Sequence, residues 1–149
     1  FVVGHFHYVI VTGVYYAILS GVYYWFPKWS GRYYDEPSAV WHFWLSTVSA
    51  NFTFLPMQFL GLAGMPRRIP DYALQFADFN LIASIGGFVF GFSQLLFVFA
   101  ILQGFWLQRR ATAQVWEGAR GLEWTVDSPA PEHTFSRAPT VTDKLYQYD

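Results

Sequence analysis

Residues 79–108 read FNLIASIGGFVFGFSQLLFVFAILQGFWLQ and contain no Asp, Glu, Lys or Arg. A helix needs about 20 apolar residues, at ~1.5 Å rise each, to cross a hydrocarbon layer of roughly 30 Å. Two earlier stretches, Phe1–Pro27 and Pro37–Pro66, also lack these four residue types. Inside a bilayer every backbone amide needs an internal partner, so helices are expected despite many β-branched and aromatic residues. The sequence therefore predicts three transmembrane helices.

The composition of the chain agrees with a membrane location. Apolar residues make up 54% and charged residues 13%, about half of the roughly 25% typical of soluble domains. Eight charged residues lie before Arg109, whereas eleven lie in residues 109–149. We therefore expect an all-α membrane protein in which residues 1–108 form a three-helix transmembrane segment. Residues 109–149 are expected to form an extended extramembrane tail.

Net charge and cysteine content exclude several classes of function. The net charge is −1, which gives no signal for a nucleic-acid partner. The chain has no cysteine, so it has no disulfides, thiolate metal sites or thiol catalysis. No charged leader precedes the first apolar stretch, and we expect a processed or split product.

Two histidines occupy alternate positions near the start of the first stretch, in Gly4-His5-Phe6-His7-Tyr8. Residues two apart on an α-helix are separated by about 200°, so the two rings point to opposite faces and cannot bind one ion. Each imidazole would serve its own site, and imidazole is a good axial ligand for haem iron. Two haems flanking the helix, with Phe6 between their ligands, would satisfy both. The pattern by itself also fits two interfacial histidines bonded to water or carbonyls.

Arg67 and Arg68 follow the second stretch, in Met65-Pro66-Arg67-Arg68-Ile69-Pro70. Three spans place this loop opposite the side that carries Lys28 and the basic tail, which the positive-inside rule assigns to the cytoplasm or matrix. An arginine pair on the outer side requires an anionic partner. Haem propionates would serve, because guanidinium binds carboxylates in bidentate fashion. An ordinary contact with lipid phosphates is the alternative.

Several segments together resemble one protein family. The chain is similar to the last third of subunit I of cytochrome c oxidases, in the haem–copper oxidase superfamily. The similarity covers nearly the whole chain, and its spacing is more specific than any single motif. The matching segments are FVVGHFHY at 1–8, WHFW at 41–44, NFTF at 51–54, FLGLAGMPRRIPDY at 59–72, DFNLIASI at 78–85 and GLEWTVDSPAPEHTF at 121–135.

The resemblance implies specific roles. The three helices would be the last three of twelve. His5 would bind the iron of the high-spin haem, where oxygen is reduced opposite copper, and His7 the iron of the low-spin haem. Arg67 and Arg68 would contact haem propionates, and no further catalytic residue is expected in this chain. The implied cofactors are two haems, with haem A as the expected type, and a copper ion ligated by residues outside this chain.

The resemblance also implies an assembly. The expected enzyme is a terminal respiratory oxidase that reduces oxygen to water with electrons from cytochrome c and pumps protons. This chain would be inactive alone and would require the remainder of subunit I together with subunits II and III. We expect an integral protein of a bacterial plasma membrane or the mitochondrial inner membrane. Its C-terminal tail would lie on the cytoplasmic or matrix side.

Two alternatives and one departure from the family pattern remain. A quinol oxidase of the same superfamily would keep the histidine pair, and a non-catalytic accessory membrane subunit would need no cofactor. Gln58 stands where many family members carry histidine, which puts a local hydrogen bond in doubt. His42 and His133 match family histidines, and we assign structural roles to both.

Overall fold

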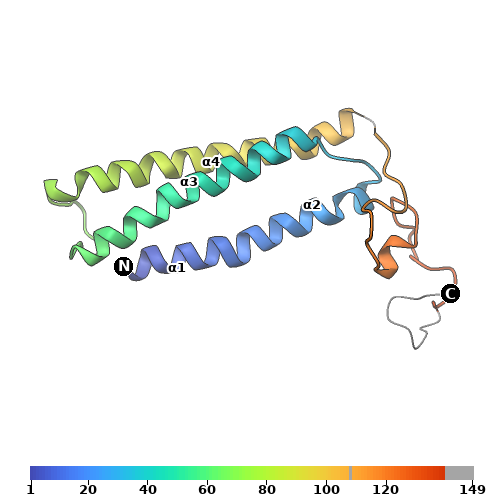
Figure 1. Ribbon diagram of the computed structural model, residues 1–149, viewed down its shortest axis with the longest axis horizontal. Coiled ribbons are helices and arrows are strands. Elements are labelled where there is room, and N and C mark those ends of the chain that lie inside the picture. Colours follow the sequence, from blue (N-terminus) through green and yellow to red (C-terminus); the bar gives the residue numbers. More distant parts are fainter. Residues whose placement is uncertain (108, 140–149) are drawn as a thin grey trace. The chain divides into compact units, whose positions relative to one another are not determined.

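The computed structural model describes residues 1–107 and 109–139, and the regular secondary structure of this part of the chain is helical. No strand occurs in it, and its β pairing is limited to an isolated bridge between Arg32 and Arg110. The prediction of an all-helical protein is therefore confirmed. Gln108 and the last ten residues of the predicted tail lie outside the described residues. The elements, shown in Figure 1, are α1 (Val2–Ile10), η1 (Val11–Tyr15), α2 (Tyr16–Ser30), α3 (Glu36–Leu62), η2 (Leu74–Phe76), α4 (Ala77–Trp106) and η3 (Leu122–Trp124).

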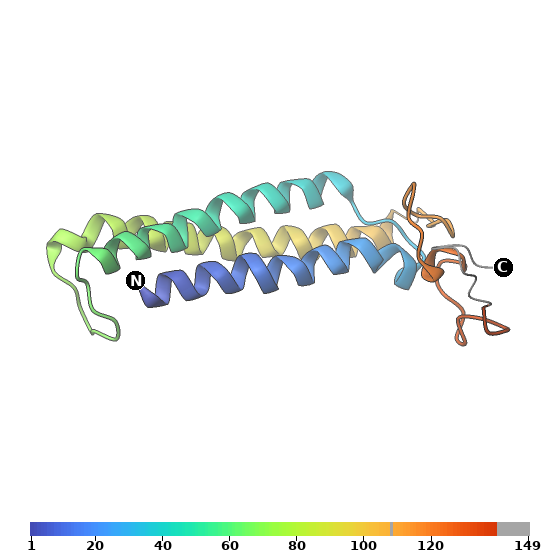
Figure 2. The same ribbon diagram turned by 60° about the horizontal axis from the view of Figure 1, so that its bottom comes forward.

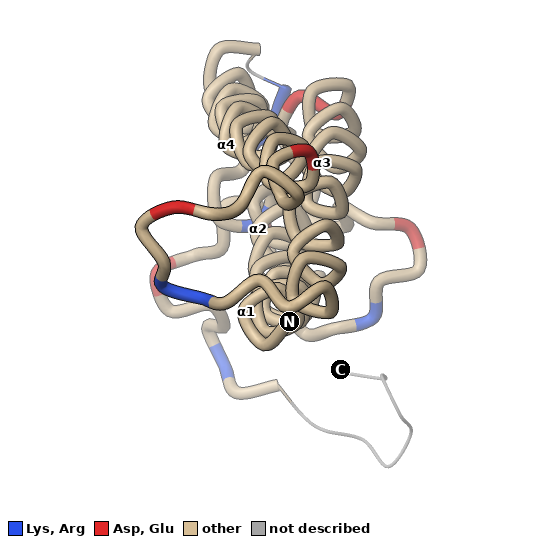
Figure 3. Tube along the Cα trace, turned by 90° about the vertical axis from the view of Figure 1, so that its left-hand side faces the viewer, with Lys and Arg blue, Asp and Glu red and all other residues tan. Residues whose placement is uncertain are grey.

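Two helical segments are long and apolar enough to cross a membrane: Val2–Ser30 and Leu74–Trp106. Figure 3 shows charged residues concentrated in the connecting segments, while the helices themselves are almost free of them. The second expected stretch forms the continuous helix α3, which is too rich in polar residues to meet the same criterion. Several of its hydroxyl and amide side chains bond to carbonyls one turn earlier, as Ser49 does to Leu45 (2.6 Å) and Thr53 to Ser49 (2.7 Å).

Helix α3 ends earlier than its uncharged stretch does, at Leu62 instead of Pro66. Gly64 has φ +90°, in the left-handed region that glycine adopts without a steric penalty. Its amide donates to the Gly61 carbonyl (3.2 Å), and the Met65 amide donates to the Leu60 carbonyl (3.0 Å). This pair of bonds is a Schellman motif, which satisfies the last carbonyls of the helix.

The first span contains one turn of π-helix, η1, directly after the helix that carries the histidine pair. Thr12 donates from its hydroxyl to the carbonyls of Tyr8 (2.8 Å) and Val9 (3.3 Å) where α1 passes into η1. A π-turn inserts one residue into the helix and shifts the faces that follow it. The face defined by α1 therefore does not continue in register along α2.

The chain forms two compact units. The first contains Phe1–Ser20 and Glu36–Ala100, and the second contains Gly21–Asp35 with the described residues from Ile101 onward. Within the first unit, α3 and α4 run alongside each other in both views (Figures 1 and 2). The first unit holds every residue that the sequence assigned to a haem, and it is the setting of the candidate site.

Candidate functional site

The histidine-bearing helix α1 packs closely on α3 through Gly4. A Cβ atom on Gly4 would lie 3.0 Å from Met57 Cβ and 3.1 Å from the backbone nitrogen of Gln58. These distances are tighter than about nine in ten real Cβ contacts, so α3 would have to shift by a few tenths of an ångström to admit a side chain there. Because Gly4 has no side chain, α1 and α3 can approach each other closely at this point.

A hydrogen bond one turn further along fixes the same interface. Tyr8 donates from its hydroxyl to Asn51 Oδ1 of α3 over 2.5 Å. Asn51 in turn donates to the Thr47 carbonyl (2.8 Å), which orients its amide. Both residues are half-buried, and partial removal from water strengthens such a bond. Gly4 and Tyr8 therefore define the face of α1 that contacts α3.

His7 lies on one flank of this face and is held by two neighbours. Its Nδ1 is 2.9 Å from the Val3 carbonyl oxygen, and its ring stacks on Phe54 of α3 at 5.8 Å with an interplanar angle of 13°. A carbonyl can only accept, so Nδ1 carries the proton and Nε2 is the unprotonated nitrogen of the neutral ring. Metal-bound histidines are usually oriented in this way by a bond from the other ring nitrogen.

His5 lies on the other flank, about 200° around the helix from His7. Its ring stacks on Phe1 at 5.9 Å, and within the described part of the chain it makes no side-chain hydrogen bond. Both imidazoles are exposed, as is Phe6 between them (56%). A single helix thus presents two separate imidazole ligands, each with a nitrogen available to an external partner.

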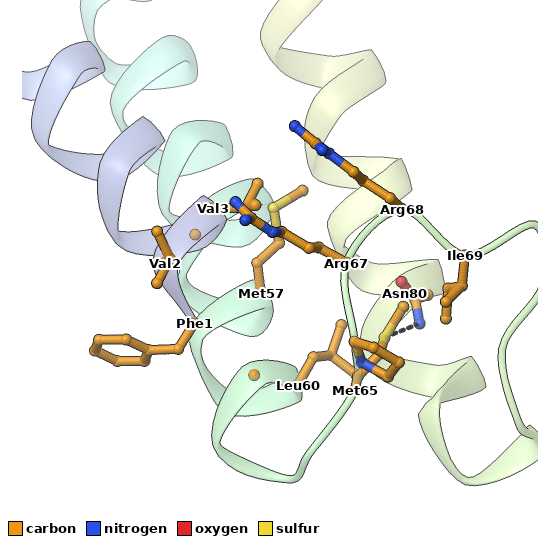
Figure 4. Close-up of a pocket in the computed structure, with 13 residues that line it drawn as sticks. Phe1, Val2, Val3, Met57, Leu60, Met65, Arg67, Arg68, Ile69 and Asn80 are labelled. Atoms are coloured by element: carbon orange, nitrogen blue, oxygen red, sulfur yellow. Dashed lines mark hydrogen bonds between the residues drawn. The ribbon is translucent and has the colours of Figure 1, made fainter.

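Arg67 and Arg68 lie at the same end of the first unit as the histidine pair. They line a pocket of about 780 Å³ together with Val2 and Val3 of α1, and Figure 4 shows both guanidinium groups extending from their loop on the side of α1 and α3. Both side chains are exposed, and neither forms an ion pair with a carboxylate of the described residues. Arg68 has φ +60°, a left-handed conformation that is uncommon outside glycine and is often found at functional sites.

The other two histidines, His42 and His133, are not brought to this site. His42 is buried (1% exposed) in α3 and contacts the Phe97 ring at 5.5 Å, whereas His133 is exposed in the tail. Gln58 is half-buried beside Gly4, with no side-chain hydrogen bond to another described residue. In residues 1–107 and 109–139 no three His, Cys, Asp or Glu side chains gather as a metal site. In the described part of the chain, His5 and His7 are therefore two separate imidazoles and do not belong to a cluster of possible metal ligands.

The two histidines and two arginines fit a pair of metal-containing macrocycles, because in such a group the ring itself supplies most of the ligands to the metal. Such a group needs one imidazole nitrogen from the protein, an apolar flank and a cation for its carboxylates. The exposed His5 and His7 rings would supply the nitrogens, and the guanidinium groups of Arg67 and Arg68, which form no ion pair within the described residues, would supply the cations.

Comparison with known proteins identifies the family to which the chain belongs. Residues 1–89 match the family model described as cytochrome c and quinol oxidase polypeptide I. The chain belongs to this family. Subunit I of cytochrome c oxidase is an integral membrane protein, in agreement with the two apolar helices.

Named relatives in this family match almost the entire chain. It is 46% identical over 145 residues to cytochrome c oxidase subunit 1 of Cereibacter sphaeroides, covering 96% of this chain and 26% of the relative. It is 43% identical over 148 residues to the subunit of the same name from Thermostichus vulcanus, covering 99% and 27%. The putative cytochrome c oxidase subunit 1-beta of Streptomyces avermitilis is 38% identical. The chain thus spans about a quarter of the length of these relatives.

The structure adds positioning residues that sequence reasoning did not single out. Val3 and Phe54 contact His7, and Tyr8 with Asn51 fixes the helix that carries both histidines. Tyr8 and Asn51 lay within the recognised segments, but no spacing rule links residues 43 apart in sequence. Only the packing of α1 on α3 reveals that they meet.

Proposed function

We propose that this chain is the part of a terminal oxidase catalytic subunit that supplies one axial ligand to each of two haems. The observation that carries the proposal is the His5–Phe6–His7 sequence on one rigid helix, with two exposed rings on opposite flanks. Family membership supports the same function. The spacing of one residue sets how far apart the two ligand nitrogens lie, and the packing of α1 on α3 keeps that spacing constant.

Each residue has a proposed task. His7 would hold the low-spin haem iron through Nε2, with Val3 and Phe54 fixing the ring, and His5 would hold the high-spin haem iron. Phe6 would fill the space between the two ligands. Arg67 and Arg68 would neutralise propionate carboxylates. When bound, haem of the A type would supply one-electron transfer and oxygen reduction, with copper held by residues outside this chain.

We further infer that α3 is a third span. Within the second unit, the Tyr33 amide donates to the Arg109 carbonyl (3.0 Å) and the Ala111 amide to the Gly31 carbonyl (2.9 Å). Residues 31–33 and 109–111 must then lie on one side of the membrane. The chain between them crosses an even number of times, and α4 accounts for one crossing. The bonds from polar side chains of α3 to its own carbonyls make that helix compatible with a bilayer.

The electron donor and the assembly are part of the proposal. The three named relatives are cytochrome c oxidase subunits, which favours cytochrome c as donor to the complete complex, coupled to proton pumping. The family description also includes quinol oxidases, so quinol is the second candidate. A dicopper centre in a co-purifying subunit would support cytochrome c, and its absence would support quinol. The remaining three quarters of subunit I, with subunits II and III, would complete the enzyme.

The test is replacement of each histidine in the assembled oxidase, followed by optical spectroscopy of the haems. His7→Ala should remove the low-spin haem signal, because that haem would lose the ligand that this chain is proposed to supply. His5→Ala should instead perturb carbon monoxide binding at the high-spin haem. His133→Ala, in the exposed tail, is the control and should change neither signal. Unchanged spectra in both ligand variants would refute the assignment.

A further inference from the structure

Lys28, in the last turn of α2, is buried although it carries a charge. Only 3% of it is exposed. Its ammonium donates to two backbone carbonyls of the tail, that of Ala113 (2.9 Å) and that of Val126 (2.7 Å). The same nitrogen lies 5.3 Å from the centre of the Trp124 ring, within cation–π range. All four residues belong to the second unit, in which the tail segment lies beside the end of α2 (Figure 1).

Lys28 forms no ion pair with a carboxylate of the described residues, although the charges of Asp127 and Glu123 lie near enough to favour its charged form. The groups in contact with it are neutral: two carbonyl oxygens and an indole face. A buried ammonium without such partners would be strongly unfavourable. Lys28 is the donor to both carbonyls. The Ala113 and Val126 carbonyls with the Trp124 ring, called the cation cage below, are therefore complementary to a monovalent ammonium ion.

The backbone around the cage contacts the same helix end. Trp116 donates from its indole nitrogen to the Tyr24 carbonyl (2.9 Å), and the Ala130 amide donates to the Lys28 carbonyl (3.3 Å). Tyr24 packs edge-on against Trp124 at 5.0 Å. Residues 113–130 contain one short helix, η3, so little regular structure holds them together. The bonds from Lys28 join two points of this segment that are 13 residues apart in sequence.

We propose that residues 113–130 form a binding site for a primary ammonium ion, which Lys28 fills from the end of α2, and that its occupancy holds the tail in its folded position. When Lys28 occupies the cage, its ammonium joins the carbonyls of Ala113 and Val126. It also lies over the buried ring of Trp124 (3% exposed). This role is independent of haem binding and lies outside the site described above.

Limited trypsin digestion of the assembled oxidase tests the proposal, because cleavage requires local unfolding of the chain around the cut. Arg120 lies between the two caged carbonyls in sequence, and Arg137 lies beyond them, so the two cuts serve as probe and internal reference. Lys28→Met should increase cleavage after Arg120 at least tenfold relative to Arg137, with haem spectra unchanged. Arg110→Gln, an equal loss of charge at an exposed side chain, should leave the ratio unchanged. An unchanged ratio in Lys28→Met would overturn the proposal.

Chemical rescue distinguishes a cation site from simple filling of space. Lys28→Ala retains Cβ, so n-propylammonium supplies the missing atoms and should restore protection at Arg120 in a saturable manner. Neutral n-propanol has nearly the same shape and should not restore it. Equal rescue by both compounds, or rescue by neither, would contradict a cation cage.

If the Lys28 variants do not assemble, the Trp124→Leu variant provides a second test. It retains the lysine and should raise the ratio of cleavage at Arg120 to cleavage at Arg137 about threefold. An unchanged ratio in this variant would also contradict the proposal.

Discussion

His5 and His7 are two positions apart, yet their surroundings differ. His7 is oriented by the Val3 carbonyl and the Phe54 ring, whereas His5 contacts Phe1 and makes no side-chain hydrogen bond within the described residues. An imidazole fixed by a second partner is a more basic and less mobile ligand. In the proposed enzyme the two ligands would therefore differ in rigidity, although they share one helix.

The arginine pair leads to a prediction about reduction potential. Arg67→Gln or Arg68→Gln should lower the midpoint potential of a haem by tens of millivolts, because removal of a nearby positive charge favours the oxidised iron. The matching lysine substitutions keep the charge and should produce a smaller shift. Redox titration of the assembled oxidase measures both. Arg137→Gln in the tail serves as control, and potentials that stay constant in both loop variants would argue against propionate contact.

At the scale of helices, glycine determines how closely the elements approach. A Cβ on Gly86 of α4 would lie 2.7 Å from the backbone carbon of Phe52 and 2.7 Å from the backbone nitrogen of Thr53 in α3. Backbone atoms cannot move aside as the end of a flexible side chain can. Gly87, the next residue, would place its Cβ 3.9 Å from Thr53 Cγ2, which is ordinary contact. Adjacent glycines therefore have different functions in the same helix.

This difference predicts unequal effects on stability for two neighbouring alanine substitutions. Gly86→Ala should destabilise the helix pair by about 1–3 kcal/mol, the usual cost of overpacking. Gly87→Ala should be close to neutral, since it gains helix propensity without a clash. Thermal unfolding of the purified oxidase, followed by loss of the haem spectrum, compares the two variants. Equal effects at both positions would show that α3 and α4 do not approach at Gly86.

At the scale of the whole chain, the order of membrane crossings determines on which side each loop lies. In the proposed topology, the hydrogen bonds between residues 31–33 and 109–111 would require an even number of crossings between them. Of the described residues, two helical segments meet the length and composition criterion for a span, and one of these, Leu74–Trp106, lies in that interval. Helix α3 is the remaining candidate for the second crossing.

Cysteine labelling tests this topology, and the absence of native cysteine in the chain simplifies it. Glu36→Cys and Glu117→Cys should react with a membrane-impermeant maleimide from one side of the membrane. Tyr72→Cys, in the loop that follows Arg68, should react from the other side. The oxidase without an introduced cysteine provides the background. Labelling of Glu36→Cys and Glu117→Cys from opposite sides would mean that α3 does not cross.

The sequence by itself determined the helical class, the uncharged stretches and the alternate spacing of His5 and His7. These properties follow from local chain geometry: a helix has a fixed rise and rotation per residue, so composition and spacing are sufficient to predict them. The family resemblance rests on the same local segments. The Schellman end at Gly64 is local as well, but a single glycine among twelve in the sequence does not identify it.

Only the tertiary structure determined which residues meet across the chain. Tyr8 bonds to Asn51, Phe54 stacks on His7, and Lys28 enters a cage formed by residues 85 and 98 positions away. Such contacts depend on which helix faces pack together and on the path of an irregular tail. Neither is specified by periodicity, because the free energy that selects them comes from close packing and from partners for buried polar groups.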